Sequence, residues 1–486
     1  MKSEMAFPGA MDIWSSGLRL FVFSTISTFI LSCASLILRS QITVGPGADF
    51  ATLADAGPGL VAGDTVIVLD GIYSNGTQFL FDLTGTAEAP IFIKSESMYG
   101  AIFDGSAESI HLVRCKHVIL DGFLIQHQTG NGMNIDDGGM YDVPASHITV
   151  RNCHFRDINA VGNNDLLKLS GLDDFHIHHC IFENGAAGSG VDMVGCHHGI
   201  IEDCIFNNTG NSGIQAKGGT QHIRIQRNEF RDIAQRAINI GGSTGLEFFR
   251  PPLPDPIVSA FEAANIEVFS NLFIGSWSPI AYVGCINSAV RNNTFYQPQN
   301  WAIRILQETT VPGFLPCSYN EFSNNIVFLA NDLTEVNIGP NTLPATFEFN
   351  NNLWYNAANN FWVPVLPVSD ENQIIADPLF VDTVAEEFTL QTQSPAIASG
   401  FPYGDPETDF ELYAFSNPPS IGAFEWQNPE ICWGDFDNDG CVSISDLLLF
   451  LTGFSCENEC IHDLDNDGLT SVSDLLILLS LMGNCC

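Results

Sequence analysis

Short alternating patterns of apolar and polar residues recur along most of this chain. A triplet with apolar first and third residues, and usually a polar middle residue, occurs at 110–112, 133–135, 167–169, 191–193, 214–216, 238–240, 280–282 and 303–305. A second apolar segment follows several of these triplets, as in HITV, HIRI, NIEV and TFEF. Alternation with a period of two is typical of β-strands, because successive side chains point to opposite faces. The pattern therefore predicts short strands separated by Gly- and Asn-rich turns, with no helical crossover between them.

A short box that ends in an aromatic or apolar residue follows each second segment. Aligned positions in these boxes are mostly 22 to 32 residues apart, which suits one coil of a solenoid with several strands per turn. We therefore predict a parallel β-helix. Asparagines in this column would hydrogen-bond along the stack, and cysteines in it would be buried thiols. The aligned positions are Cys153, Cys180, Cys204, Asn228, Asn271, Asn293, Asn325 and Asn352.

The repeats resemble the right-handed parallel β-helix superfamily of pectate lyase-like proteins, from about Gln41 to Trp426. The segments VAGDTVIVLDGIY, GTAEAPIFIKSE and AIFDGS resemble the start of the group that contains alginate lyases and chondroitinase B. The segments ADPLFVD, FTLQTQSPAIASG and IGAFEW resemble a common end of bacterial β-helix proteins. The resemblance implies an all-β, right-handed parallel β-helix over 41–428 and leaves the substrate open.

The middle residue of each triplet must point away from the core, because the two outer residues are apolar. Only five lysines occur in the chain, and two of them fall on this one predicted face. Neighbouring coils lie about 4.8 Å apart, so we expect Lys168 beside Asp192 and Lys217 within reach of Asp192. The first outward column is His111, Asn134, Lys168, Asp192, Gln215, Asn239, Ala281 and Arg304, and the second is Asp136, Ser170, Val194, Lys217 and Gly241.

Long insertions follow the same predicted strand at 136–147, 243–264 and 307–319. They would form a wall along one side of the polar face, which suits a polymer. Trp277, Phe248 and Phe249 lie in or near these loops, where aromatic rings could stack on sugar rings.

A lyase acting on a uronic-acid polymer must neutralise the substrate carboxylate, remove the proton at C5 and expel the 4-linked oxygen. In the resembled lyases these roles belong to basic residues and calcium. By that resemblance Lys217 is the candidate base, Lys168 and Arg304 neutralise charge, and Asp192 orients Lys217 or holds calcium. Further candidate substrate contacts are His111, Asn134, Gln215 and Asn239.

Other interpretations of this face remain open. A glycoside hydrolase needs two carboxylates on opposite sides of the sugar bond, and Asp136 is the chief companion of Asp192. A non-catalytic glycan-binding β-helix would need neither base nor acid. A Lys beside an Asp is also often only a surface ion pair. Alginate, pectate, another uronate polymer or a sulfated glycan all suit the predicted face as substrates.

The last part of the chain contains a duplication, DFDNDGCVSISD and DLDNDGLTSVSD. Acidic residues at positions 1, 3, 5 and 12 with Gly at position 6 are typical of an EF-hand-type calcium loop, and each loop precedes an apolar segment that we expect to be helical. The pair resembles a type I dockerin, which implies Ca²⁺ and a cohesin-type or other cell-surface partner for residues 429–486. The predicted ligands are Asp435, Asp437, Asp439 and Asp446 in the first loop, and Asp463, Asp465, Asp467 and Asp474 in the second.

Charge and cysteine usage bear on location. The formal net charge is -39, which argues against nucleic-acid binding because phosphate recognition needs clustered Lys and Arg. Residues 1–40 contain an apolar run after Arg19 that predicts a secretory signal, or an anchor helix if it is not cleaved. Six cysteines lie in the last 55 residues and predict disulfides in an exported protein. We therefore expect a secreted or cell-surface protein, with no membrane contact unless residues 1–40 are retained.

Overall fold

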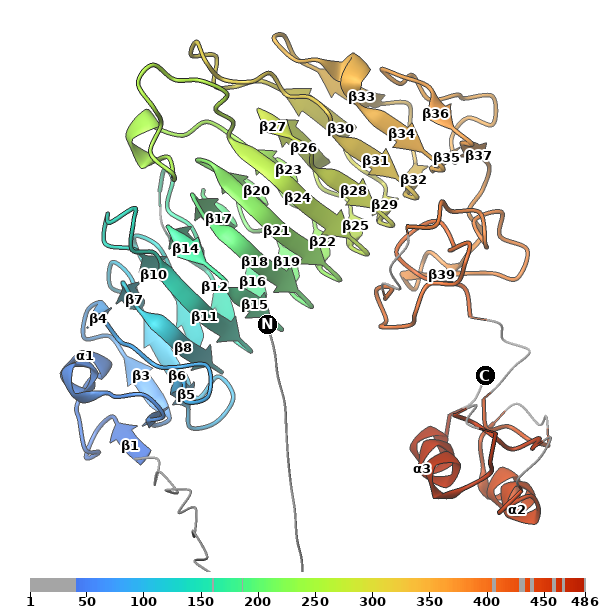
Figure 1. Cartoon of the computed structure of the whole chain (residues 1–486), viewed down its shortest axis with the longest axis horizontal. Coiled ribbons are helices and arrows are strands. Elements are labelled where there is room, and N and C mark those ends of the chain that lie inside the picture. Colours follow the sequence, from blue (N-terminus) through green and yellow to red (C-terminus); the bar gives the residue numbers. More distant parts are fainter. Residues whose placement is uncertain are drawn as a thin grey trace, which may run out of the picture. The chain divides into compact units, whose positions relative to one another are not determined.

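The computed structural model describes residues 41–159, 161–185, 187–403, 408–427, 433–437, 441–456, 460–465 and 468–484. The predicted signal segment 1–40 lies outside these residues. Figure 1 shows successive coils stacked in chain order, each contributing a strand to three parallel sheets. No helix within the described residues is long and apolar enough to cross a membrane.

The largest sheet, here called sheet A, has 15 strands. They are β1 (Gln41–Val44), β2 (Thr65–Val68), β5 (Ile91–Ser95), β8 (Lys116–Asp121), β11 (Ala145–Arg151), β14 (Leu172–Asp173), β15 (His176–His178), β18 (His197–Glu202), β21 (Thr220–Gln226), β24 (Ala263–Phe269), β27 (Cys285–Ile286), β28 (Ala289–Arg291), β31 (Glu321–Ser323), β34 (Glu348–Asn350) and β36 (Asp370–Glu371).

The second sheet, sheet B, has 12 strands that follow sheet A after a short corner. They are β3 (Gly71–Tyr73), β6 (Ala101–Asp104), β9 (Leu124–Gln126), β12 (His154–Arg156), β16 (Ile181–Glu183), β19 (Ile205–Asn207), β22 (Glu229–Arg231), β25 (Leu272–Ile274), β29 (Thr294–Tyr296), β32 (Ile326–Leu329), β35 (Leu353–Asn356) and β37 (Ile374–Ile375).

The third sheet, sheet C, has ten strands and carries the predicted outward columns. They are β4 (Gln78–Phe81), β7 (Ile110–Val113), β10 (Met133–Asp136), β13 (Leu167–Ser170), β17 (Ser189–Val194), β20 (Ser212–Lys217), β23 (Arg236–Gly241), β26 (Ser278–Val283), β30 (Trp301–Leu306) and β33 (Thr334–Ile338).

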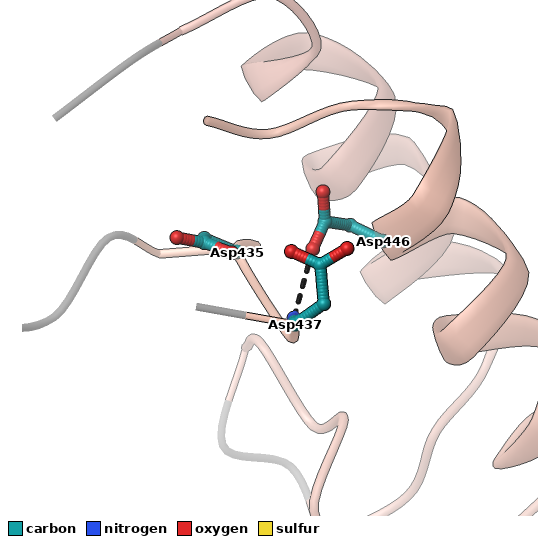
Figure 2. Close-up of side chains that lie close together, drawn as sticks. All are labelled: Asp435, Asp437 and Asp446. Carbon is teal, nitrogen blue, oxygen red and sulfur yellow. Dashed lines mark hydrogen bonds between the residues drawn. The ribbon is translucent and has the colours of Figure 1, made fainter. Parts of the chain in front are cut away.

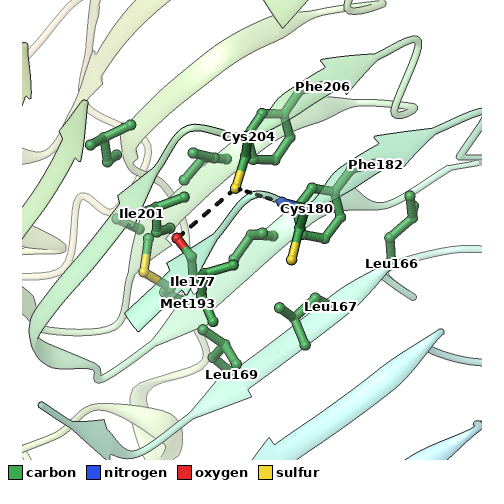
Figure 3. Close-up of a cluster of buried hydrophobic side chains, with 14 of the residues drawn as sticks. Leu166, Leu167, Leu169, Ile177, Cys180, Phe182, Met193, Ile201, Cys204 and Phe206 are labelled. Atoms are coloured by element: carbon green, nitrogen blue, oxygen red, sulfur yellow. Dashed lines mark hydrogen bonds between the residues drawn. The ribbon is translucent and has the colours of Figure 1, made fainter. Parts of the chain in front are cut away.

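The interior is a set of stacked columns, as the period-two pattern predicts. Phe155, Phe182, Phe206, Phe230 and Phe273 point inward from sheet B, and their rings stack at centroid distances of 4.8 to 4.9 Å. Figure 3 shows two of these rings beside the buried thiols and the aliphatic side chains of the neighbouring strands. These rings, fully removed from water, are a large part of the hydrophobic stabilisation of the solenoid.

The corner between sheets A and B holds the predicted column of asparagines and cysteines. Each asparagine side-chain oxygen accepts the backbone N–H of the previous coil, as Asn293 Oδ1 does from Asn271 at 2.9 Å. Its amide also donates along the stack, as Asn293 donates to Asn325 Oδ1 at 3.0 Å. The earlier coils carry Cys153, Cys180 and Cys204 there, and all three are buried free thiols. Both predictions for this column are therefore confirmed.

The remaining elements are short. They are α1 (Leu53–Ala56), the 3₁₀ turns Gly57–Gly59, Leu246–Phe248 and Pro344–Thr346, the antiparallel pair β38 (Phe380–Asp382) and β39 (Glu387–Leu390), and helices α2 (Ile444–Thr452) and α3 (Val472–Leu481). Residues of β38 and β39 pack on the outward apolar side chains of sheet B near its last coils, including Leu272, Ile326 and Leu353. Helices α2 and α3 share a small core of their own around Phe450 and Leu478.

Candidate functional site

The outer face of sheet C carries the first predicted column in unbroken register. Successive partners are His111, Asn134, Lys168, Asp192, Gln215, Asn239, Ala281 and Arg304. The second column is also in register, with Asp136 beside Ser170, Ser170 beside Val194, and Val194 beside Lys217. The sequence therefore predicted correctly which side chains share this face.

Two lysines converge on one carboxylate at the centre of this face. Lys168 Nζ contacts Asp192 Oδ2 in a short ion pair. Lys217 Nζ lies 3.3 Å from the other oxygen, Asp192 Oδ1, and this oxygen has no hydrogen bond within the described part of the chain. The Asp192 side chain is only 2% exposed, whereas those of Lys168 and Lys217 are 20% and 15% exposed. The Asp192 carboxylate thus lies at the buried bottom of the cluster, and the two amines lie nearer the solvent.

A second carboxylate, Asp165, completes the cluster and was not among the predicted residues. Its Oδ2 lies 3.5 Å from Lys168 Nζ, and its Oδ1 accepts the backbone N–H of Ser189 at 2.7 Å. Burial, followed by repulsion from Asp192, raises the pKa of Asp165 to about 7. Burial opposes the charge of Lys168, but attraction to Asp192 and Asp165 outweighs it and raises the pKa of Lys168. Two amines therefore lie beside two carboxylates, and one of these carboxylates, Asp165, has a pKa of about 7.

Lys217 ends its strand at a tightly held turn. The buried Glu262 accepts the N–H of Gly218 at 3.0 Å, together with the N–H and hydroxyl of Thr244. A side chain at Gly242 would meet Gln215 Nε2 at 2.7 Å and Lys217 Cδ at 3.4 Å, and its φ of +152° also disfavours one. Glu262 and Gly242 lie in the insertion after β23, so the insertion fixes the position of Lys217.

At one end of the face, His111 lies between two acids. Its Nε2 contacts Asp136 Oδ2 at 2.7 Å, and its Nδ1 contacts Glu108 Oε2 at 3.0 Å. Burial lowers the pKa of His111, but the two acids together outweigh burial and raise it to about 9. His111 is therefore a cation at neutral pH, and Asp136 is committed to it rather than to Asp192.

Arg304 lies at the other end of the face and does not join the lysines. Four strand steps separate it from Asp192, which corresponds to roughly 19 Å. Its guanidinium lies 4.2 Å from the Trp301 ring centroid and donates to Asn337 Oδ1 at 3.2 Å. Arg236, which the sequence analysis missed, donates to Asn239 Oδ1 at 3.0 Å and to Glu308 at 2.7 Å. Burial, with the nearby Arg236, lowers the pKa of Arg304.

The three insertions contact one another, as a continuous wall requires. Tyr141 in the first donates its hydroxyl to the carbonyl of Glu247 in the second. The second and third meet through the hydrogen bond from Thr309 to Glu262 at 2.5 Å and through the rings of Phe249 and Phe314 at 5.3 Å.

One aromatic expectation was wrong. Phe249 is 2% exposed and packs on Phe314, so it cannot stack on a sugar ring. Its ring instead joins two insertions through apolar contact. Phe248 and Trp277 remain exposed, by 58% and 43%, and stay available for stacking.

The duplicated acidic loops lie at the starts of α2 and α3. Figure 2 shows Asp435, Asp437 and Asp446, which each offer a carboxylate oxygen within 4.8 Å of the others. Asp463, Asp465 and Asp474 form a matching group, whereas Asp439 and Asp467 lie outside the described residues.

Asp446 also shapes the first loop, because it accepts N–H groups from Phe436 at 2.7 Å and Asp437 at 3.1 Å and caps α2 through Ser443. Asp474 does the same for the second loop. Burial opposes the charge of Asp446, but these N–H groups outweigh it and lower the pKa of Asp446. Oxygen-only groups of this kind suit a hard cation such as Ca²⁺.

The helices that follow expose apolar side chains in equivalent pairs, 28 residues apart in sequence. Ile444 and Val472 are 69% and 60% exposed, and Leu448 and Leu476 are 62% and 63% exposed. Cys456 and Cys460 form a disulfide, as cysteine density in this region predicts. Cys432, Cys485 and Cys486, which are also among the six cysteines of this region, lie outside the described residues.

Comparison with known proteins agrees with the observed architecture. Residues 91–250 match the family described as "Right handed beta helix region". No curated protein matches the chain. The parallel strand pairing establishes an all-β, parallel β-helix solenoid, as the sequence predicted, and the family match over residues 91–250 agrees with it.

Several solved structures are similar to this chain. Pectate lyase Pel9A is 12% identical, with 80% of this chain and 98% of that chain covered and a TM-score of 0.49. An alginate lyase from Paenibacillus sp. str. FPU-7 is 15% identical, with 69% and 98% covered and a TM-score of 0.42. A mannuronic acid specific polysaccharide family 6 lyase from human gut microbiota is 15% identical, with 70% and 83% covered and a TM-score of 0.45.

Proposed function

We propose that the outer face of sheet C is the active site of a lyase that cleaves a uronic-acid polymer by β-elimination. The observation that carries the proposal is the convergence of Lys168 and Lys217 on the buried Asp192. In a chain with 17 basic and 56 acidic residues, such a pair on one face is a local exception that suits an anionic substrate.

The proposed chemistry assigns one role to each member of the cluster. In the proposed step Lys217 Nζ, as a neutral amine, accepts the proton from C5 of the uronate and becomes an ammonium. The C4–O bond breaks with its electron pair on the leaving oxygen, which takes a proton from solvent, and a C4–C5 double bond forms. Lys168 pairs with the substrate carboxylate and favours the negative charge that develops beside C5, while Asp192 positions both amines.

Residues along the same face would bind the rest of the polymer. Asn134 and Gln215 flank the cluster in the column, and Asn239 with Arg236 lies further along it. Arg304, four strand steps from Asp192, would pair with another uronate unit rather than with the one that reacts. Trp277, exposed beside Trp301, would stack on a sugar ring.

A panel of polysaccharides tests the activity. The full chain is incubated with alginate, polygalacturonate, another uronate polymer and a sulfated glycan, and both ultraviolet absorbance of unsaturated product and reducing ends are measured. A lyase raises both signals. Reducing ends without absorbance would identify a hydrolase and reject the proposal, and binding without either signal would identify a glycan-binding module.

We further propose that the C-terminal module binds two Ca²⁺ and attaches the protein to a cohesin-type or other cell-surface partner. The two equivalent acidic groups support calcium binding, and the exposed apolar pairs on α2 and α3 support attachment. Titration of the chelator-treated full chain by calorimetry should give a stoichiometry near two, in keeping with the two groups. Asp446→Ala should remove one site, because position 12 supplies a ligand in this loop type.

We also propose that the protein is exported. The apolar run in residues 1–40 and the disulfide between Cys456 and Cys460 support it. N-terminal sequencing of protein recovered outside the producing cells would show cleavage within residues 1–40. Recovery of the intact N-terminus in a membrane fraction would instead identify an anchor.

A further inference from the structure

A hollow lies on the outer face of sheet A, on a different sheet from the lysine cluster. It consists of two adjoining depressions of about 290 and 190 Å³, which share Asn287, Ala289 and Arg291. Its floor and walls come from five successive strands, β21, β24, β28, β31 and β34.

The register explains why this part of the face is hollow. One outward column reads Arg224, Glu267, Ala289, Glu321 and Glu348 across the five strands. Ala289 is the small residue in the middle, and its methyl group leaves space between the longer side chains of Glu267 and Glu321. The Ala289 methyl group therefore lies at the centre of the floor of the hollow, with a carboxylate on each side of it.

One wall of the hollow is held rigidly. Arg291 donates to Glu321 Oε1 at 3.0 Å, and its guanidinium lies 4.1 Å from the centroid of the Tyr403 ring. The Tyr403 hydroxyl also contacts Glu321 and donates to Ser323 at 2.7 Å. Burial opposes the charge of Glu321, but Arg291 outweighs it and lowers the pKa of Glu321. This wall therefore presents fixed, charged groups before any ligand arrives, which reduces the entropy lost on binding.

Several other groups around the hollow are open to solvent. Glu267, Glu348 and Asn287 are exposed, and the Tyr319 ring at the rim is 64% exposed. Carboxylates and amides are planar groups that accept hydrogen bonds from neighbouring hydroxyls, and an exposed ring offers a surface for the apolar face of a sugar. Three acids and two arginines around the hollow leave it slightly negative, which disfavours a polyanion.

We propose that this hollow binds a neutral polysaccharide, one whose sugars carry hydroxyls and no acid groups. The five strands span on the order of 19 Å, which accommodates several sugar units along the solenoid. This site goes beyond the proposed lyase function and does not depend on it. It would hold the protein on a neutral component of a mixed polysaccharide matrix while sheet C acts on the acidic component.

Affinity electrophoresis of the full chain tests the proposal, with glucomannan, xylan and β-glucan as neutral probes and polygalacturonate as the acidic probe. We expect at least one neutral polymer to retard the wild-type protein. Ala289→Trp should weaken that retardation at least tenfold, because the ring fills the hollow from an outward position and leaves the core intact. Glu267→Gln should weaken it about threefold, because the amide loses one acceptor.

Ala385→Trp is the matched control, since it adds the same ring at an exposed turn away from the hollow, and it should bind as the wild type does. Lys217→Ala should also leave neutral-polymer binding unchanged, which separates this site from the lyase proposal. Absence of retardation by every neutral probe would overturn the proposal. Retention of full binding by both Ala289→Trp and Glu267→Gln would overturn it as well.

Discussion

On the outer faces of sheets C and A, strands from successive coils pair in the same parallel register. The two faces differ in how far their charged side chains are exposed to water. On sheet C, Asp192 and Asp165 are almost fully buried, and two lysines are drawn onto them. On sheet A, Glu267 and Glu348 stand exposed around a hollow. The insertions after the strands of sheet C lie beside the lysine cluster, because Glu262 in the second insertion accepts the N–H of Gly218 after Lys217 and the hydroxyl of Thr309 in the third.

The two faces of one solenoid therefore suit two different kinds of site. Charges removed from water interact strongly and shift one another's pKa values, which proton transfer requires. Charged groups exposed to water interact weakly with one another, and their polar atoms are free to hydrogen-bond to a ligand. Substitutions on the two faces should therefore differ in size and in kind.

Lys217→Ala should give the largest effect. If Lys217 is the base, turnover of a confirmed uronate substrate should fall about 10²–10⁴-fold, because no other amine replaces it at C5. Lys116→Ala, which removes a lysine from sheet A, is the matched control and should retain activity. Initial rates of unsaturated product measure both variants, and activity of Lys217→Ala within a few-fold of wild type would reduce Lys217 to an ion-pair partner.

Asp192→Ala should destabilise the fold. It leaves Lys168 and Lys217 facing each other with only Asp165 nearby, so we expect a loss of about 3 kcal/mol in the free energy of unfolding. Urea denaturation measures the loss. Asp203→Ala, on the turn after sheet A, is the comparison and should cost about 1 kcal/mol or less. Equal losses in the two variants would contradict the distinction between the faces.

Asp165→Asn should change the pH dependence of stability. The pKa of Asp165 rises from 3.8 to about 7 on folding, so between these values the folded state holds more protons on it than the unfolded state. Wild-type stability should therefore fall as pH rises through this window, by at most about 1.4 kcal/mol per pH unit from this group. Asp165→Asn should flatten that slope in denaturation at pH 5, 6 and 7. An unchanged slope would show that Asp165 is ionised throughout.

Glu267→Gln should have the smallest effect on stability. The side chain is exposed, so the free energy of unfolding should stay within about 0.5 kcal/mol of wild type. The same urea curves provide the value. A loss of more than about 1 kcal/mol would mean that the sheet A face also depends on its charges for folding.

The sequence predicted which residues form the columns of sheet C better than it predicted which residues belong to the candidate site. Alternation and coil length placed Lys168, Asp192 and Lys217 together, and counting strand steps along the same column would also have separated Arg304 from them. Asp165 lies three residues before Lys168 and could have been noticed by that spacing. Arg236 is the first residue of β23 and lies two residues before the triplet 238–240, so the triplet alone did not reveal it.

The amino-acid sequence by itself determined the solenoid, its buried columns and the residues on each outer face. A period of two within strands leaves only one register that buries the apolar side chains, and the recurring triplets and boxes mark the successive coils. Tertiary structure alone decided which outward charged side chains are buried. It also decided that Phe249 is buried and that Glu262 holds the turn after Lys217. These depend on long insertions whose paths no periodicity specifies, because each insertion is positioned by contacts with the others.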